Sequence, residues 1–223
     1  MEEEKFKINK EEIKAETIET AKQFKNNIKN TNIKEQAKET KGLIKDMLKN
    51  PIDKMKNILL DVSGRYVKNT IFLLIFWLII IFIGGTYRTI YNWGLTRVFD
   101  NILDIIKLLV APILGILVYS LIVFVMNKRR KNNLMNYITL FTVVNLPIVI
   151  SDIILLFNIF NYELKTLTNP ISILCMTLKS VLVFIAVKEI FEINDKQAIK
   201  KFTILQIIYY VFYIIISLFG IKI

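Results

Sequence analysis

Long apolar segments alternate with short polar ones over residues 70–223. A helix that crosses a hydrocarbon core of ~30 Å needs roughly 20 mostly apolar residues, and five segments qualify. They cover about residues 70–86, 102–126, 137–157, 170–190 and 202–220. The pattern predicts an all-α, polytopic membrane protein, built as a bundle of five transmembrane helices and preceded by a polar leader over residues 1–69.

Two prolines modify the predicted spans. Pro147 lies in the middle of the third span, where it removes a backbone donor and should kink the helix. We expect Asn145, Thr142 and Ser151 to satisfy the backbone freed by this kink. Pro170 opens the fourth span, and a proline is tolerated in the first helical turn.

Apolar residues in the leader are sparse but recur every three or four positions, as on one face of a helix. Asn50-Pro51 should cap and start a new helix. Over 1–41 the face is thin, which favours a solvated, partly helical tail. Over 51–63 it is denser, which favours docking of an amphipathic helix on the membrane surface. The second half of the face comprises Ile44, Met47 or Leu48, Ile52, Met55, Leu59 and Val62.

The distribution of Lys and Arg predicts the orientation, because short cytoplasmic loops are enriched in these residues. The loop between the second and third spans carries Lys128, Arg129, Arg130 and Lys131, and the turn between the fourth and fifth carries Lys188, Lys196, Lys200 and Lys201. We therefore expect a cytoplasmic N-terminus, an external C-terminus, and a basic loop 128–131 that faces anionic lipid. Abundant Lys, Asn and Ile fit the codon bias of an AT-rich genome, and we expect the protein to lie in the plasma membrane of a bacterium with such a genome.

The composition excludes several kinds of catalytic and metal-binding site. The chain holds 30 Lys and Arg against 19 Asp and Glu, no His and one Cys. A histidine base, a histidine metal ligand and a disulfide within the chain are therefore excluded. Phosphate-binding glycine loops and nucleophile elbows are also lacking. We expect neither an enzyme nor a cofactor, and no nucleic-acid partner, because acidic residues interleave with the basic ones without an aromatic platform.

Four ionisable residues within the spans form a candidate polar cluster, because burying a charge in a membrane is costly unless it is paired. They are Asp104 and Lys107 in the second span, Asp152 in the third and Lys179 in the fourth. All four fall in the predicted outer half, and Asp152 and Lys179 differ in depth by only about 6 Å. The arrangement is interpreted as two neutralising pairs that fix helix register. A substrate- or proton-linked site is the alternative.

The order of features resembles the bacterial branch of the Yip family, the Ypt/Rab-interacting membrane proteins. The resemblance rests on a soluble leader before five close spans, Ala111-Pro112 in the second span, Asn145-Leu146-Pro147 in the third and the two basic loops. It implies the five-span fold and a non-enzymatic role in organising membranes. The D-L-Y-G-P signature of eukaryotic members is absent from this leader, so Rab binding and site residues do not carry over.

Two functions follow as hypotheses. The first is a membrane scaffold or adaptor whose cytoplasmic leader engages anionic inner-leaflet lipid or a partner protein. The alternative is a small transporter, or transporter subunit, that uses Asp104, Lys107, Asp152 and Lys179. A transporter with five spans and no internal repeat has little room for alternating access, which favours the adaptor.

Overall fold

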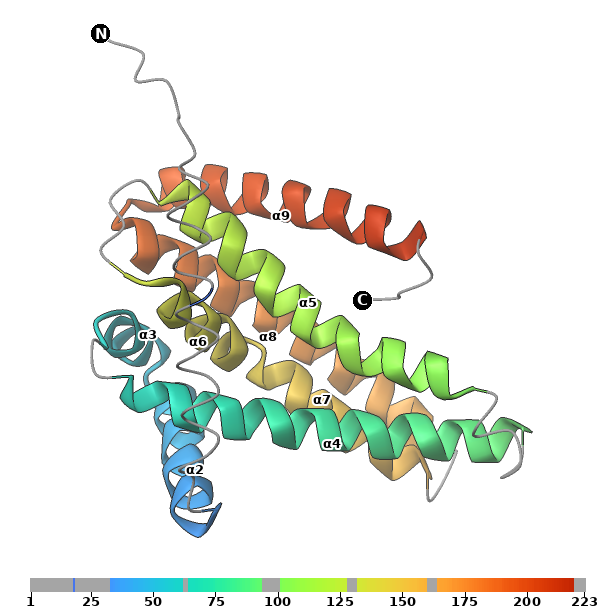
Figure 1. Ribbon diagram of the computed structural model, residues 1–223. Helices are drawn as coiled ribbons and strands as arrows, with labels where there is room; N and C mark the ends of the chain where they lie inside the picture. Colours follow the sequence, from blue (N-terminus) through green and yellow to red (C-terminus); the bar gives the residue numbers. More distant parts are fainter. Residues whose placement is uncertain are drawn as a thin grey trace, which may run out of the picture.

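A computed structural model describes residues 18, 33–61, 64–93, 101–127, 132–159 and 164–218 of the chain. Every regular element within these residues is a helix (Figure 1). The elements are α2 (Ile33–Lys49), α3 (Pro51–Leu59), α4 (Arg65–Trp93), α5 (Ile102–Met126), α6 (Leu134–Val144), α7 (Leu146–Leu156), the short 3-10 helix η2 (Phe157–Ile159), α8 (Lys165–Phe191) and α9 (Asp195–Leu218). The predicted all-α class is confirmed.

Four helices, α4, α5, α8 and α9, are long and apolar enough to cross a membrane. The pair α6 and α7 meets the same criteria when it is taken as one broken span. Helices α7 and α8 pack against each other, α4 packs on α5, α6 and α7, and α9 packs on α8 and α5. The chain therefore has the architecture of an integral membrane protein with four to five candidate spans.

The predicted boundaries agree best for α5, which covers the expected residues 102–126. Helix α4 begins at Arg65 and α9 at Asp195, several residues before the apolar segments that predicted them. Helix α8 begins at Lys165, so Pro170 lies inside the helix rather than at its start. The reason is that apolar length marks only the part of a helix that needs hydrocarbon, and polar turns extend it beyond.

The predicted kink is confirmed as a break at Asn145, where α6 ends and α7 begins with a bend of about 40°. Pro147 occupies the first turn of α7, where its missing amide hydrogen is tolerated. The buried Asn145 side chain donates through Nδ2 to the Phe141 carbonyl oxygen at 2.7 Å. Thr142 donates to the carbonyl of Ile138, whereas Ser151 bonds the hydroxyl of Ser172 on α8 at 3.0 Å.

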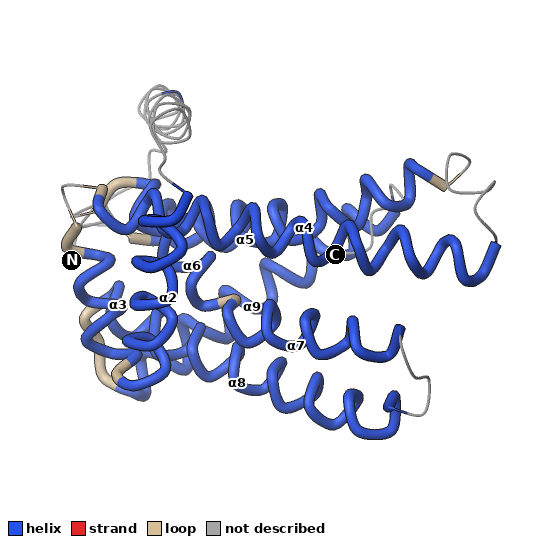
Figure 2. Tube along the Cα trace, turned by 90° about the horizontal axis from the view of Figure 1, so that it is seen from below, coloured by secondary structure: helices blue, strands red, loops and turns tan. Residues whose placement is uncertain are grey.

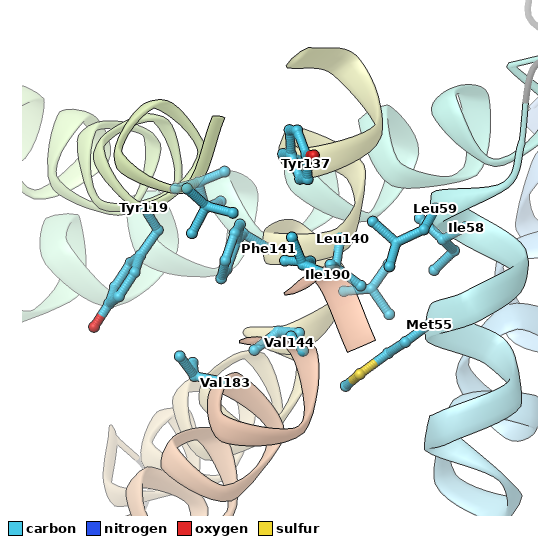
Figure 3. Close-up of a cluster of buried hydrophobic side chains, with 14 of the residues drawn as sticks. Met55, Ile58, Leu59, Tyr119, Tyr137, Leu140, Phe141, Val144, Val183 and Ile190 are labelled. Carbon is cyan, nitrogen blue, oxygen red and sulfur yellow. The ribbon is translucent and has the colours of Figure 1, made fainter. Parts of the chain in front are cut away.

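The core is densest at one end of the bundle, where α5, α6 and α8 meet α3 (Figure 3). The fully buried Tyr137, Leu140, Phe141 and Val144 project from α6 into this region. Figure 2 places α2 and α3 at the same end, beside the ends of the helices that could cross a membrane. The two leader helices are therefore packed into the molecule rather than separate from it.

Candidate functional site

Helix α3 is held by its apolar face. Asn50 caps its N-terminus by accepting from the Asp53 amide, and Pro51 occupies the first turn, as the sequence predicted. Met55 is 0% exposed and Ile58 1% exposed, and together with Leu59 they pack against Leu140 of α6 and Ile190 of α8 (Figure 3). The prediction that this face lies on lipid is therefore wrong for Met55 and Leu59, because α6 and α8 cover them.

The packing of Met55, Ile58 and Leu59 against α6 and α8 is called the seat of α3 below. Polar contacts reinforce this seat. The Asn136 side chain on α6 donates from Nδ2 to the carbonyl oxygen of Leu59 at 2.9 Å, in a buried position. Leu59 is the last residue of α3, so its carbonyl lacks a partner within the helix. Lys56 forms an ion pair of 3.5 Å with Glu189 of α8. The end of α3 is thus attached to two helices that lie far along the chain.

Replacing Asn136 with alanine should lower the free energy of unfolding by about 1–3 kcal/mol, because the buried Leu59 carbonyl then loses its donor. Thermal unfolding of the purified full chain in detergent measures this loss. Asn57→Ala, at an exposed position of α3, is the matched control and should change little. Equal midpoints for the two variants would contradict the role assigned to the Asn136–Leu59 bond.

Helix α2 lies across α4 near the start of α4 (Figure 1). Its inner face consists of Gln36, Thr40, Leu43 and Met47, all buried. Thr40 donates through Oγ1 to the backbone carbonyl of Asn69 at 3.4 Å. The expectation of a solvated tail is therefore wrong from Ile33 onward, because the thin face that predicted it is packed on α4. The rest of that expected tail, Ile18 apart, lies outside the described residues.

Asp104 and Lys107 form the pair that the sequence predicted, with 3.2 Å between Oδ1 and Nζ. They lie three residues apart in the first turns of α5, and both are exposed. An exposed pair of this kind contributes little to stability. The pair does not extend toward the other two charged residues of the proposed cluster.

Asp152 and Lys179 do not pair with each other. The half-buried Asp152 carboxylate accepts a hydrogen bond from the indole Nε1 of Trp77 on α4, at 2.6 Å. Lys179 instead places its ammonium 6.0 Å from the centre of the Tyr119 ring on α5. The expected four-member cluster is therefore divided into an exposed ion pair, a carboxylate–indole contact and a lysine over an aromatic ring.

The lysine belongs to an aromatic group that the sequence did not reveal. Tyr119 stacks on Tyr209 of α9 with 4.2 Å between ring centroids, and on Phe141 of α6 at 5.5 Å. The Tyr119 hydroxyl donates to Oε1 of Gln206 at 3.0 Å. Gln206 is a polar residue inside a predicted span, and this is the sequence signal that could have identified the aromatic group. The group joins α5, α6 and α9 and packs as a structural unit.

The basic loop Lys128, Arg129, Arg130 and Lys131 lies outside the described residues. It connects the end of α5 to the start of α6, and those two helix ends are described. The prediction that this loop faces anionic lipid remains a prediction.

The chain matches no protein-family model, no curated protein and no solved structure.

Proposed function

We propose that this chain is a non-enzymatic scaffold or adaptor of a bacterial plasma membrane, with five spans and with α2 and α3 as its cytoplasmic docking element. The observation that carries the proposal is the seat of α3, which fixes both leader helices to the end of the bundle through Met55, Ile58 and Leu59. A flexible tail would sample many positions. A seated helix pair instead presents its outer side at a constant position relative to the membrane.

The orientation of the proposed adaptor is supported by the charges around the seat. The turn between α8 and α9 lies at the same end of the bundle as α3, since Lys56 contacts Glu189 there. Lys188, which pairs with Asp195 at 2.6 Å, and Lys196 lie in or beside this turn. Clustered lysines at one end favour a cytoplasmic location for it, and the resemblance to the Yip family favours the same role.

The outer side of α3 is the proposed contact surface for a protein partner. Two exposed apolar residues border it: Ile52, at the edge of the buried face and 42% exposed, and Leu60, which directly follows α3 and is 72% exposed. Asp53 and Asn57 are exposed beside them. Apolar residues surrounded by polar ones are the usual composition of a protein contact patch. A partner bound there would be held next to the membrane.

The test is co-purification of the tagged full chain in mild detergent, comparing the wild type with two double variants. Ile52→Ser with Leu60→Ser should abolish partner recovery, because it removes the apolar part of the contact while leaving the seat intact. Asp152→Asn with Lys179→Met should leave recovery unchanged. Deleting residues 1–63 is unsuitable, because it would also remove Met55, Ile58 and Leu59 from the core. If Asp152→Asn with Lys179→Met loses the partner while Ile52→Ser with Leu60→Ser keeps it, the adaptor proposal is wrong.

A further inference from the structure

Helix α2 has four distinct faces. Its buried residues are Gln36, Thr40, Leu43 and Met47. Successive residues of an α-helix are separated by about 100°, so the residue before and the residue after each buried one lie on the two flanks. The residues before are Glu35, Glu39, Gly42 and Asp46, and those after are Ala37, Lys41, Ile44 and Leu48. One flank is therefore acidic, and the other is mainly apolar.

The face opposite the buried one is basic. Two residues correspond to about 200°, or roughly half a turn, and the residues two before each buried position are Lys34, Lys38, Lys41 and Lys45. All four are exposed. Leu48 on the apolar flank is 65% exposed and Ile44 is partly exposed, so the protein itself leaves much of this flank uncovered. The lysine face and the apolar flank adjoin each other, with Lys41 at their boundary.

The depth of α2 relative to the membrane follows from its contact with α4. Thr40 bonds the carbonyl of Asn69, the residue directly before the uncharged apolar stretch 70–86 that begins the first span. Helix α2 also runs crosswise to α4 (Figure 1). A helix that crosses a membrane-spanning helix at the edge of its apolar stretch lies in the plane of the headgroup layer.

We propose that α2 is an in-plane membrane helix that binds the phosphate headgroups of anionic inner-leaflet lipids through Lys38, Lys41 and Lys45. The apolar flank with Ile44 and Leu48 enters the acyl region, and the acidic flank faces the cytoplasm. Lysine stems reach along apolar surface while their ammonium groups stay at the phosphates. The acidic flank selects this orientation, because carboxylates near anionic lipid would be repelled.

The inference rests on the proposed cytoplasmic placement of α2 and α3, but it requires no protein partner. A chain that fails the co-purification test can still satisfy the lipid test, so the two failures are distinguishable.

The first measurement is the depth of single cysteines in the full chain, with Cys175→Ala as background. Leu48→Cys and Glu39→Cys place a fluorophore on the apolar and the acidic flank of the same helix. The chain is reconstituted in vesicles of phosphatidylcholine and phosphatidylglycerol that carry lipids spin-labelled in the acyl chain. The label at 48 should be quenched at least about twofold more strongly than the label at 39. Equal quenching, or stronger quenching at 39, would overturn the proposal.

The second measurement is retention of phosphatidylglycerol by the purified full chain in native mass spectrometry. Each lysine near an anionic surface contributes about fivefold in affinity, so Lys38→Gln with Lys41→Gln should weaken retention by about 25-fold. Glu35→Gln with Glu39→Gln alters the same helix by the same number of charges and should not weaken it. Unchanged retention in the lysine variant, or equal loss in both variants, would overturn the assignment of these lysines.

Discussion

Replacing Met55 with alanine is expected to release the leader helices from the end of the bundle. Met55 is 0% exposed and packs in the core that α3 shares with α6 and α8. Truncating a fully buried methionine lowers stability by about 2–5 kcal/mol. Because Met55 belongs to α3, this change mainly weakens the docking of α2 and α3 on the bundle. Hydrogen–deuterium exchange of the full chain should therefore show faster exchange of the amides in residues 33–59, with the amides of α5 unchanged.

The matched control for this prediction is Ile52→Ala on the same helix. Ile52 is 42% exposed, so its truncation removes little packing and should leave the exchange of α2 near that of the wild type. If Met55→Ala also leaves exchange unchanged, α3 is not held by its buried face. The in-plane position inferred for α2 would then depend on its own packing against α4 and on lipid.

Replacing Lys179 with methionine is expected to stabilise the protein. Lys179 lies near the middle of α8, a helix apolar enough to cross a membrane, and its described contact is with the Tyr119 ring rather than with a carboxylate. A charge at the centre of a spanning helix costs about 2.5–3.5 kcal/mol on insertion scales, and the cation–π contact returns only about 1 kcal/mol. We expect a gain of about 2 kcal/mol, measured by thermal unfolding in nanodiscs.

Lys107→Met is the comparison for that prediction. Lys107 is exposed near the start of α5 and pairs with Asp104, so its removal should shift stability by no more than about 0.5 kcal/mol. Loss of stability on Lys179→Met would show that the lysine makes an essential interaction within the bundle. That outcome would favour a structural role for Lys179 over the transporter hypothesis, because the charge would then be retained for a contact that holds the helices together.

The parts of the fold that could be predicted are those determined by local patterns. The apolar length of residues 102–126 predicted α5 with the correct bounds, and Pro147 predicted the break at Asn145. Asn50-Pro51 likewise predicted the start of α3. Each of these depends on backbone geometry or hydrocarbon thickness, which a few neighbouring residues determine.

Contacts between distant helices could not be predicted in this way. The periodicity of the leader showed that Met55 and Leu59 share a face, but an apolar face can be covered by lipid or by protein equally well. The carboxylate of Asp152 was expected beside Lys179 because their depths match, whereas the partner is Trp77. The sequence position of a residue in a span gives its depth in the membrane. It does not give the direction in which the side chain points, which depends on how each helix is rotated about its own axis.

The seat of α3 also determines the order in which the molecule can be completed. Leu59 leaves the ribosome long before Asn136 and Ile190, the residues that hold it. At about 5–20 residues per second, the chain between Leu59 and Ile190 takes on the order of ten seconds to synthesise. Until α6 and α8 are both made, the apolar face of α3 lacks surfaces that cover it in the complete molecule. Helix α3 is therefore made before the spans that hold it but is among the last elements to reach its final position, and its docking waits for the insertion of α8.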